Sequence, residues 1–223
     1  MENYVQKKYK EKEELFEKYY KLLREWNEKI NLTSITEKEE VYLKHFEDSL
    51  IGEKFIKKGS TVIDIGTGAG FPSLPIKIVR EDINLTLNDC LNKRLIFLSE
   101  VIKELNLKNV RTLHSRAEDL KREEKYDYAL SRAVARLCTL CEYCLPFVKV
   151  GGYFISYKAN DSEEEIKEAE KAIITLGGKI EEIKEIKLTN EDIVRKLIFI
   201  KKIKECDKKY PRGKNLPKTK PII

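Results

Sequence analysis

The chain has 223 residues, of which 37% are charged, and its 44 Lys and Arg exceed its 38 Asp and Glu for a formal charge of +6. This length allows one substantial α/β core but not two with linkers, and the basic excess suits a polyanionic partner without demanding one. No stretch approaches the roughly 18 to 20 apolar residues of a membrane span, and the first residues lack a signal peptide's apolar segment, so we expect a cytoplasmic protein.

The first part of the chain has helical periodicity. Apolar side chains recur at steps of three, four and seven within residues 10–30, namely Leu15, Tyr19, Leu22, Leu23, Trp26 and Ile30. Thr36, with Glu39 three residues later, is interpreted as a capping box that starts a second helix. That helix is predicted to continue through Val41, Tyr42, Phe46 and Leu50. We therefore predict an N-terminal helical lobe over residues 1–58.

From about residue 60, short β-branched runs alternate with helical patterns, which indicates βα units around a mostly parallel sheet. The predicted strands are 61–65, 83–88, 109–113, 126–131, 152–158, 179–188 and 195–203. The predicted helices are 72–80, 92–106, 116–121, 134–147 and 161–176. Only the short stretch 189–192 joins the last two strands, so they should be antiparallel neighbours. This pattern favours the Rossmann-like α/β fold of class I methyltransferases over residues 59–206, with a seven-stranded sheet and an antiparallel last strand.

The end of the chain is basic. Lys208 to Ile223 carries six Lys or Arg, three Pro and no acidic residue, so we expect a flexible tail over residues 207–223. Candidate contacts to RNA phosphates are Lys158, Arg212, Lys214, Lys218 and Lys220. The alternative for each lysine is a solvated charged face. Truncation after Lys209 should weaken RNA binding and leave cofactor binding unchanged.

A glycine-rich loop gives the strongest chemical signal. Asp64 lies near the end of the first predicted strand, and Gly66, Gly68 and Gly70 follow the strand before a helix. Without Cβ atoms the backbone can turn sharply, and a ligand can press against it. In the dinucleotide fingerprint the third glycine falls where this chain has Phe71, so the spacing favours S-adenosylmethionine over NAD. We predict that Asp64 and the three glycines bind the cofactor.

Two further acids follow the next predicted strands. Asp89 lies about 20 residues past the loop, where a carboxylate can accept the two ribose hydroxyls of a nucleoside. Glu118 follows the third strand, near the place expected for the adenine edge, where it or a neighbouring backbone group could pair with the exocyclic amine. The alternative is a tight turn without a ligand and two ordinary surface acids.

The fourth strand ends in Ser131-Arg132-Ala133-Val134. Enzymes that methylate exocyclic amines of bases usually carry Asp/Asn-Pro-Pro-Tyr/Phe here. A ring nitrogen such as guanine N7 has an in-plane lone pair and no proton to lose, so it needs positioning rather than a general base. Arg132 is the candidate residue where cofactor and target meet, holding the methionine carboxylate or an RNA phosphate. Its alternative is an ion pair with a loop acid.

Several stretches together resemble one family, the bacterial 16S rRNA guanine-N7 methyltransferases, methyltransferase G, formerly called glucose-inhibited division protein B. They are Trp26-Asn27-x-x-Ile30-Asn31-Leu32-Thr33-Ser34, His45-Phe46-x-Asp48-Ser49, Asp64-Ile65-Gly66-Thr67-Gly68-Ala69-Gly70-Phe71-Pro72, Lys93-Arg94 and Ser131-Arg132-Ala133. The resemblance covers nearly the whole chain. The tail from Tyr210 also resembles that of many members, although Asn215 stands where they usually have Gly and Ile222 where they have Leu.

The resemblance implies an enzyme that binds S-adenosylmethionine. The implied cofactor contacts are Gly66, Phe71, Ala117, Glu118 and Arg132. The implied target is a guanine in the decoding-region loop of 16S ribosomal RNA, either free or in the small ribosomal subunit, and the implied product is 7-methylguanosine. We expect the protein to act as a monomer, without a metal.

Other motifs have competing interpretations. Cys138-x-x-Cys141-x-x-Cys144 has the spacing of a metal site, but on a helix three such thiols splay apart, and buried free Cys is a common core residue, so we expect free thiols. His45 is either an RNA contact or acid/base group, or a partly buried histidine bonded to neighbouring backbone. His114 is interpreted as structural.

Three alternative functions remain at this stage. The chain could be a class I methyltransferase for another RNA or a small molecule, which a labelled-methyl assay on small subunits would distinguish. It could be a nonenzymatic RNA-binding module, which predicts no cofactor binding. It could be an NAD-dependent oxidoreductase, which predicts nicotinamide binding.

Overall fold

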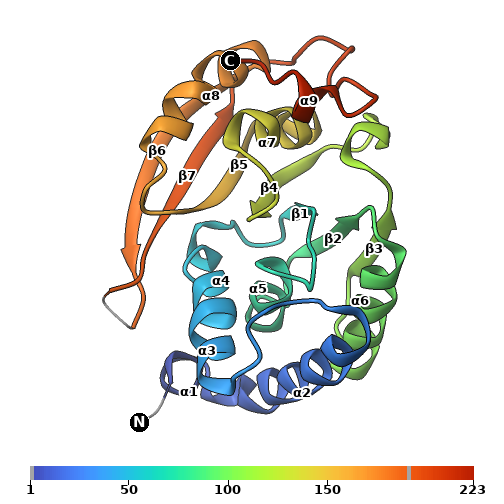
Figure 1. Ribbon diagram of the computed structural model, residues 1–223, viewed down its shortest axis with the longest axis vertical. Helices are drawn as coiled ribbons and strands as arrows, with labels where there is room; N and C mark the ends of the chain where they lie inside the picture. The colour runs from blue at the N-terminus through green and yellow to red at the C-terminus, as the bar shows by residue number, and fades with distance from the viewer. Residues whose placement is uncertain (1–2, 190–191) are drawn as a thin grey trace.

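The computed structural model describes residues 3–189 and 192–223 and is built on one seven-stranded sheet (Figure 1). The strands are β1 Thr61–Ile65, β2 Asn84–Asp89, β3 Val110–His114, β4 Tyr126–Arg132, β5 Val148–Ala159, β6 Gly178–Lys187 and β7 Val194–Lys202. Their order is β3-β2-β1-β4-β5-β7-β6. Strands β1 to β5 pair in parallel, and β7 is antiparallel to both β5 and β6. The predicted fold class is confirmed; Asn190 and Glu191 of the predicted β6–β7 connection lie outside the described residues.

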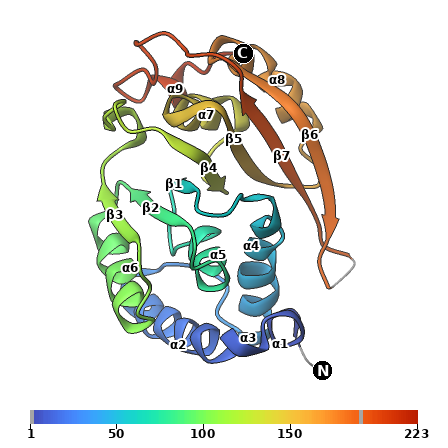
Figure 2. The ribbon, with the colours of Figure 1, turned by 180° about the vertical axis from the view of Figure 1, so that it is seen from behind.

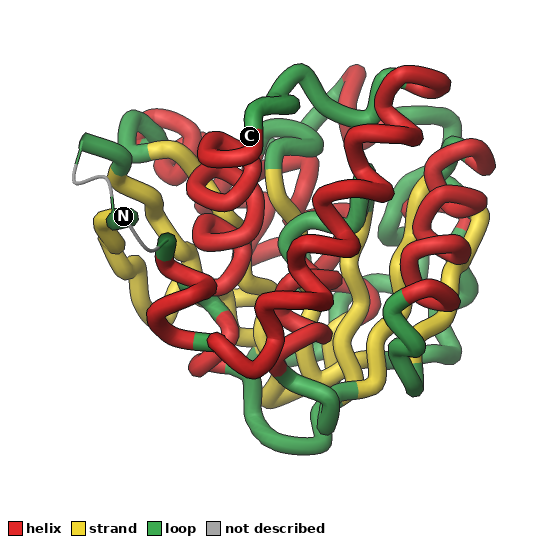
Figure 3. The backbone as a smooth tube through the Cα atoms, turned by 90° about the horizontal axis from the view of Figure 1, so that it is seen from below, coloured by secondary structure: helices red, strands yellow, loops and turns green. Residues whose placement is uncertain are grey.

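Helices pack against both faces of this sheet (Figure 3). The α-helices are α1 Tyr4–Lys8, α2 Glu13–Ile30, α3 Lys38–Val41, α4 Asp48–Leu50, α5 Ser73–Val79, α6 Asn92–Glu104, α7 Leu137–Cys144, α8 Glu163–Thr175 and α9 Leu216–Thr219. Short 3-10 turns cover Lys10–Lys12, Glu53–Phe55, Ala117–Asp119 and Leu145–Phe147, and a π-helical turn covers Tyr42–Glu47. Within the described ranges, no helix is long and apolar enough to cross a membrane.

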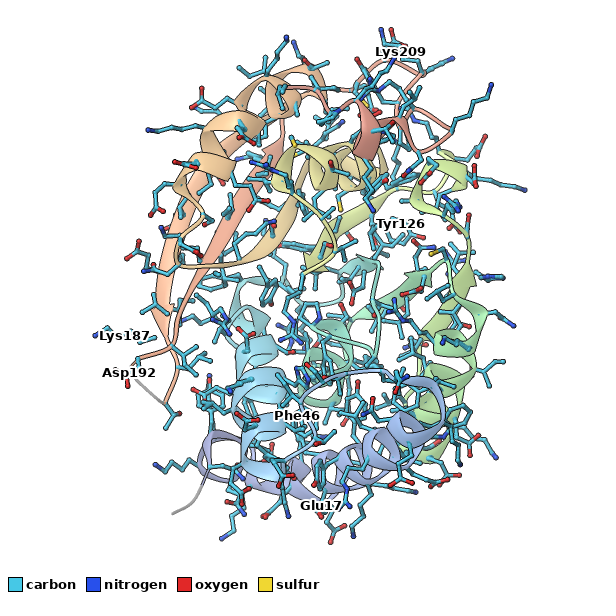
Figure 4. The ribbon with its side chains drawn as sticks, viewed as in Figure 1. Glu17, Phe46, Tyr126, Lys187, Asp192 and Lys209 are labelled. Atoms are coloured by element: carbon cyan, nitrogen blue, oxygen red, sulfur yellow. The ribbon has the colours of Figure 1, made fainter. Side chains whose placement is uncertain are left out.

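The N-terminal helices share a hydrophobic core with one face of the sheet. Phe16 and Tyr19 of α2 contact the ring of Phe46 at centroid distances of 5.0 and 5.4 Å. Tyr19 also stacks on Phe71 of the glycine loop at 5.6 Å, which ties α2 to that loop. Figure 4 shows Phe46 among these helices and Glu17 on the outer side of α2. The boundary at residue 58 stays a prediction.

The predicted capping box is wrong. Helix α3 begins at Lys38, and Glu37 precedes it without a side-chain cap hydrogen bond. The carbonyl of Thr36 instead accepts a hydrogen bond from the hydroxyl of Tyr20 (3.4 Å). The helix then widens into the π-helical turn, whose Tyr42 and Phe46 are buried. Tertiary packing of these aromatic rings has therefore overridden the local start signal.

The expectation of a flexible tail is also wrong. The chain beyond β7 folds back over α7 and forms α9, with Tyr210 and Pro217 buried (Figure 2). The hydroxyl of Thr139 in α7 donates to the carbonyl of Pro217 (2.9 Å). Lys209, at the start of this segment, lies on the outer side of the molecule (Figure 4). Composition suggested disorder because it does not reveal the surface against which the segment packs.

Candidate functional site

A cavity of about 530 Å³ opens at the carboxyl ends of β1, β2, β3 and β4. Its wall comes from the loops after these strands, the segment around Thr33 and His45 of the π-helical turn. Asn215 and Lys218, in the C-terminal segment that follows β7, also line it. In open α/β sheets this edge, where the connections diverge to the two faces, is the usual place for a ligand. The volume is also in the range of nucleotide-sized ligand pockets.

The glycine loop contributes bare backbone to this cavity. Gly66, Gly68 and Gly70 have φ angles of +72°, +61° and +97°, which side chains rarely adopt. A Cβ on Gly66 would lie 2.7 Å from Val134, and one on Gly70 would lie 2.6 Å from the hydroxyl of Tyr19. A Cβ on Gly68 would meet nothing within 4 Å. Gly66 and Gly68 line the cavity, whereas Gly70 is required for packing against α2.

Asp64 lies beneath the loop rather than on the cavity. Its side chain is fully buried, and Oδ2 accepts a hydrogen bond from the hydroxyl of Thr67 (2.9 Å). Oδ1 has no hydrogen-bond partner of normal geometry among the described residues. Burial raises the pKa of Asp64 to about 7, although Ser73, Thr67 and the charge of Arg132 act to lower it. Asp64 therefore supports the loop from behind, and direct cofactor contact stays a prediction for Gly66 and Gly68.

Asp89 lies at the floor of the cavity, at the end of β2. Its side chain is nearly inaccessible, and Oδ2 accepts hydrogen bonds from the backbone N–H of Gly68 (3.0 Å) and from Arg94 (3.2 Å). Oδ1 accepts from the N–H of Leu91 (2.9 Å). The carboxylate thus fixes the glycine loop through hydrogen bonds from two N–H groups and a guanidinium. Its predicted contact with the ribose stays a prediction.

The turn after β3 forms a second side of the cavity. Ala117 and Glu118 lie on the 3-10 turn Ala117–Asp119, and both line the cavity. Their contact with the cofactor, which the resemblance implies, stays a prediction. The side chain of Glu118 is only 5% exposed, and its nearest cation is Arg116 at 3.9 Å. This buried acid can accept a hydrogen bond from a base edge. Phe71 lines the cavity from the glycine loop.

Arg132 connects the end of β4 to the N-terminal helices. Its guanidinium donates to Oδ2 of Asp48 (3.0 Å) and to the carbonyl of Lys44 (3.3 Å). It also lies 5.1 Å from the ring centroid of Phe71. Oδ1 of Asp48 accepts a further bond from Arg195 (3.0 Å). The ion pair considered as the alternative is therefore present, with a helical rather than a loop acid, and Arg132 lines the cavity as well.

His45 forms a flat part of the wall. Its ring stacks on Phe71 with centroids 4.5 Å apart and planes at 17°. Arg132 donates to Nδ1 (3.3 Å), so the proton of the neutral ring resides on Nε2, which donates to the hydroxyl of Thr33 (2.9 Å). Burial, and then the charge of Arg132, lower the pKa of His45 to about 3. The ring is neutral near pH 7, which disfavours a general-acid role.

The proposed RNA contacts fall into two groups. Lys158 donates to the carbonyl of Ala135 (2.9 Å) and to Glu165 (2.6 Å), and Arg212 is paired with Glu142 (2.7 Å), so both already have internal partners. Lys214, Lys218 and Lys220 are exposed on the C-terminal segment. These three remain predicted phosphate contacts.

The cysteine run is part of the core. Cys138, Cys141 and Cys144 are buried residues of α7, and burial raises the pKa of the Cys141 and Cys144 thiols. Over residues 3–189 and 192–223, no cluster of three His, Cys, Asp or Glu side chains could hold a metal. His114 bonds through Nε2 to the carbonyl of Cys90 (3.1 Å).

Sequence reasoning missed several residues of the wall. Arg94 belongs to the Lys93-Arg94 stretch of the resemblance but has no role assigned to it there; it follows Asp89 by five residues, in the first turn of α6. Ala133 adopts a left-handed backbone conformation with φ of +56°, which an alanine in the sequence does not indicate. Tyr143 and Asn215 reach the cavity only through the packing of α7 and the C-terminal segment, so no local pattern identifies them.

Gly68 allows a direct test of whether a ligand occupies this cavity. We expect Gly68→Ala to weaken binding of S-adenosylhomocysteine at least tenfold, because the added Cβ would point into open cavity space. Gly59→Ala is the matched control, since Gly59 has a similar φ of +72° and equally open surroundings but lies outside the cavity. Both variants should lose about 1 kcal/mol of stability. Equal calorimetric affinities for the two variants would contradict the assignment.

Comparisons with known proteins agree with this architecture. The chain matches a family model described as rRNA small subunit methyltransferase G over residues 12–194. It is 56% identical to the ribosomal RNA small subunit methyltransferase G of Desulforamulus reducens over 213 residues, which are 93% of this chain and 89% of that protein. The enzyme of the same name from Alkaliphilus metalliredigens is 53% identical over 92% of this chain and 88% of its own length.

Among solved structures, a SAM dependent methyltransferase from Aquifex aeolicus aligns with a TM-score of 0.54 and 21% identity, covering 74% of this chain and 93% of that one. That likeness concerns the fold. The matched residues 12–194 include α2, the glycine loop and the ends of the central strands, which supply most of the cavity wall. The chain therefore belongs to the rRNA small subunit methyltransferase G family.

Proposed function

We propose that this protein transfers a methyl group from S-adenosylmethionine to N7 of a guanine in the decoding-region loop of 16S ribosomal RNA, in the cytoplasm. The observation that carries the proposal is the cavity at the sheet edge, where exposed glycine backbone and the Asp89 carboxylate face one space in a chain of this family.

The residues present fit a nucleoside with an attached amino acid. The open space at Gly68 admits a ligand directly against the backbone. Asp89 can accept hydrogen bonds from vicinal hydroxyls, and Glu118 or the backbone beside it can receive a base amine. Arg132, which lines the cavity at the end of β4, offers a cation for the carboxylate of the amino-acid part. S-adenosylmethionine, when bound, supplies an electrophilic methyl group on a sulfonium.

The protein's own task is positioning and exclusion of water. Guanine N7 carries an in-plane lone pair and no proton, so no general base is needed, and the neutral His45 is consistent with this requirement. Phe71 and His45 present a stacked, rigid surface, and Arg132 is held in place by Asp48. Such preorganised walls align a nucleophile and remove competing water.

The exposed lysines of the C-terminal segment support an RNA substrate. Lys214 and Lys220 are exposed there, and no acidic residue occurs beyond Asp207. Contacts of this kind release counterions, so RNA affinity should fall steeply with salt. The substrate is then ribosomal RNA, alone or in the small subunit.

Mapping of modified bases tests the proposal. Small subunits from a strain lacking the gene should acquire one 7-methylguanosine when incubated with the purified protein and labelled S-adenosylmethionine, and mass spectrometry should place it in the decoding-region loop. An Asp89→Ala variant should show much slower incorporation. Label that enters only small molecules, or only another RNA, would reject the proposal.

A further inference from the structure

The C-terminal segment Pro211–Lys220 contributes to the cavity. Asn215 and Lys218 line it, although they lie beyond the last strand of the sheet. Asn215 has φ of +58°, and its carbonyl accepts hydrogen bonds from the N–H groups of Lys218 (3.2 Å) and Thr219 (3.0 Å). These hydrogen bonds fix the backbone of α9 at Lys218. The backbone of Lys218 therefore has a defined place beside the cavity.

A buried acid of α7 anchors the segment. Glu142 is 1% exposed, and its carboxylate accepts three hydrogen bonds from Arg212, namely from the backbone N–H (2.8 Å), Nε (2.9 Å) and Nη2 (2.7 Å). Arg212 also donates to the carbonyl of Lys220 (2.9 Å), which joins the two ends of the segment. Thr139 holds Pro217 in between. A buried carboxylate with this many partners has few alternative arrangements.

The segment meets the end of the cavity that Ala117 and Glu118 line. Helix α7 packs against α9 and also against the 3-10 turn Ala117–Asp119, and it supplies Tyr143 to the wall. In Figure 1, α9 lies beside α7, close to the chain that follows β3. The segment, α7 and the turn after β3 therefore converge where the adenine ring is expected.

We propose that the C-terminal segment is a wall of the methyl-donor site and that Lys218 contacts the nucleoside end of the bound donor. The adenine ring offers acceptor nitrogens at its edge and an apolar face. A lysine can donate to the former while its aliphatic stem covers the latter. Arg212 acts as a positioning residue, since it reaches the donor only through the segment that it holds. This inference rests on the proposed donor site and reverses the expectation that loss of the tail spares donor binding.

Calorimetry with S-adenosylhomocysteine and the full-length protein tests the contact. Lys218→Ala should weaken binding about two- to tenfold, the range for loss of one hydrogen bond. Lys220→Ala is the matched control, because Lys220 is equally exposed two residues further on but does not line the cavity, and its affinity should equal that of the wild type. If Lys218→Ala binds the nucleoside normally and loses affinity only for a 16S rRNA fragment, Lys218 is a phosphate contact and the proposal is rejected.

Arg212→Lys tests the anchor and keeps the charge beside Glu142. Because the wall should shift, KM for S-adenosylmethionine should rise several-fold while kcat at saturating donor stays close to wild type; the thermal unfolding transition should fall modestly, because a lysine cannot make both side-chain bonds to Glu142. A general structural defect would lower kcat and the transition together and would count against a positioning role. If this variant fails to fold, Lys218→Ala still decides the proposal.

Errors in the donor site and in the C-terminal wall would give different binding results. If the wild-type protein does not bind S-adenosylhomocysteine, or if Asp89→Ala binds it normally, the donor site itself is wrong and the wall is wrong with it. If the wild type binds and Asp89→Ala weakens binding, normal affinity of both Lys218→Ala and Arg212→Lys rejects the wall alone.

Discussion

Replacing Asp89 with alanine is expected to weaken binding of S-adenosylhomocysteine by about 2 kcal/mol, or about thirtyfold. The variant loses a charged acceptor for the ribose hydroxyls, and it also frees the N–H groups of Gly68 and Leu91 that the carboxylate now holds. Both changes act on the donor site, so the affinity should fall more than for any single variant of the surrounding wall. Isothermal calorimetry on the purified protein measures the effect.

Asp119→Ala serves as the control for the Asp89 variant. Asp119 belongs to the same sheet edge and lies next to Glu118, but it does not line the cavity, so its removal should leave the affinity unchanged. Asp89→Asn should fall between wild type and Asp89→Ala, because the amide keeps one acceptor oxygen. Wild-type affinity in Asp89→Ala would mean that the ribose binds elsewhere.

Much of the sheet could be predicted from local pattern. The first strand was predicted at 61–65, as observed, and the others within a few residues of their bounds, because β-branched runs between helical patterns report burial on both faces. The positions of Asp89 and the glycine loop follow from the same reasoning, since the residue after a parallel strand reaches the carboxyl edge of the sheet. Local sequence therefore predicts the floor of the site.

Local sequence does not predict the part of the cavity wall around Arg132 and the C-terminal segment, because this part depends on residue pairs that are distant in sequence. Arg132 bonds to Asp48 across 84 residues, and Arg212 bonds to Glu142 across 70. Nothing near Glu142 in the sequence indicates that this acid is buried, so the tail that it anchors was expected to be flexible. Asp64 shows the same limit: its position near the end of β1 predicts a ligand contact, whereas burial places it behind the loop.

The buried Asp64 should make stability depend on pH in an unusual direction. In the folded protein burial raises its pKa to about 7, whereas in the unfolded chain the value is 3.8. A carboxyl whose folded pKa is raised favours the folded state fully below pH 4, where it is protonated in both states, and this contribution is lost as pH rises through 7. At about 1.4 kcal/mol per pH unit, roughly 4 kcal/mol is lost between pH 4 and pH 8.

Asp64→Asn removes this dependence and keeps an oxygen for the hydroxyl of Thr67. We expect the variant to match the wild type near pH 4 and to exceed it by up to about 4 kcal/mol in free energy of unfolding near pH 8. Denaturant unfolding of both proteins across this range gives the difference, in which other titrating groups cancel. Asp82→Asn should instead be less stable than the wild type by a constant amount across this range, because hydrogen bonds from Arg80 lower the pKa of Asp82 and its stabilising ionised form is already fully populated above pH 4. A difference between Asp64→Asn and wild type that stays constant with pH would show that Asp64 is ionised throughout, and the loop would then rest on a buried charge instead of a neutral acid.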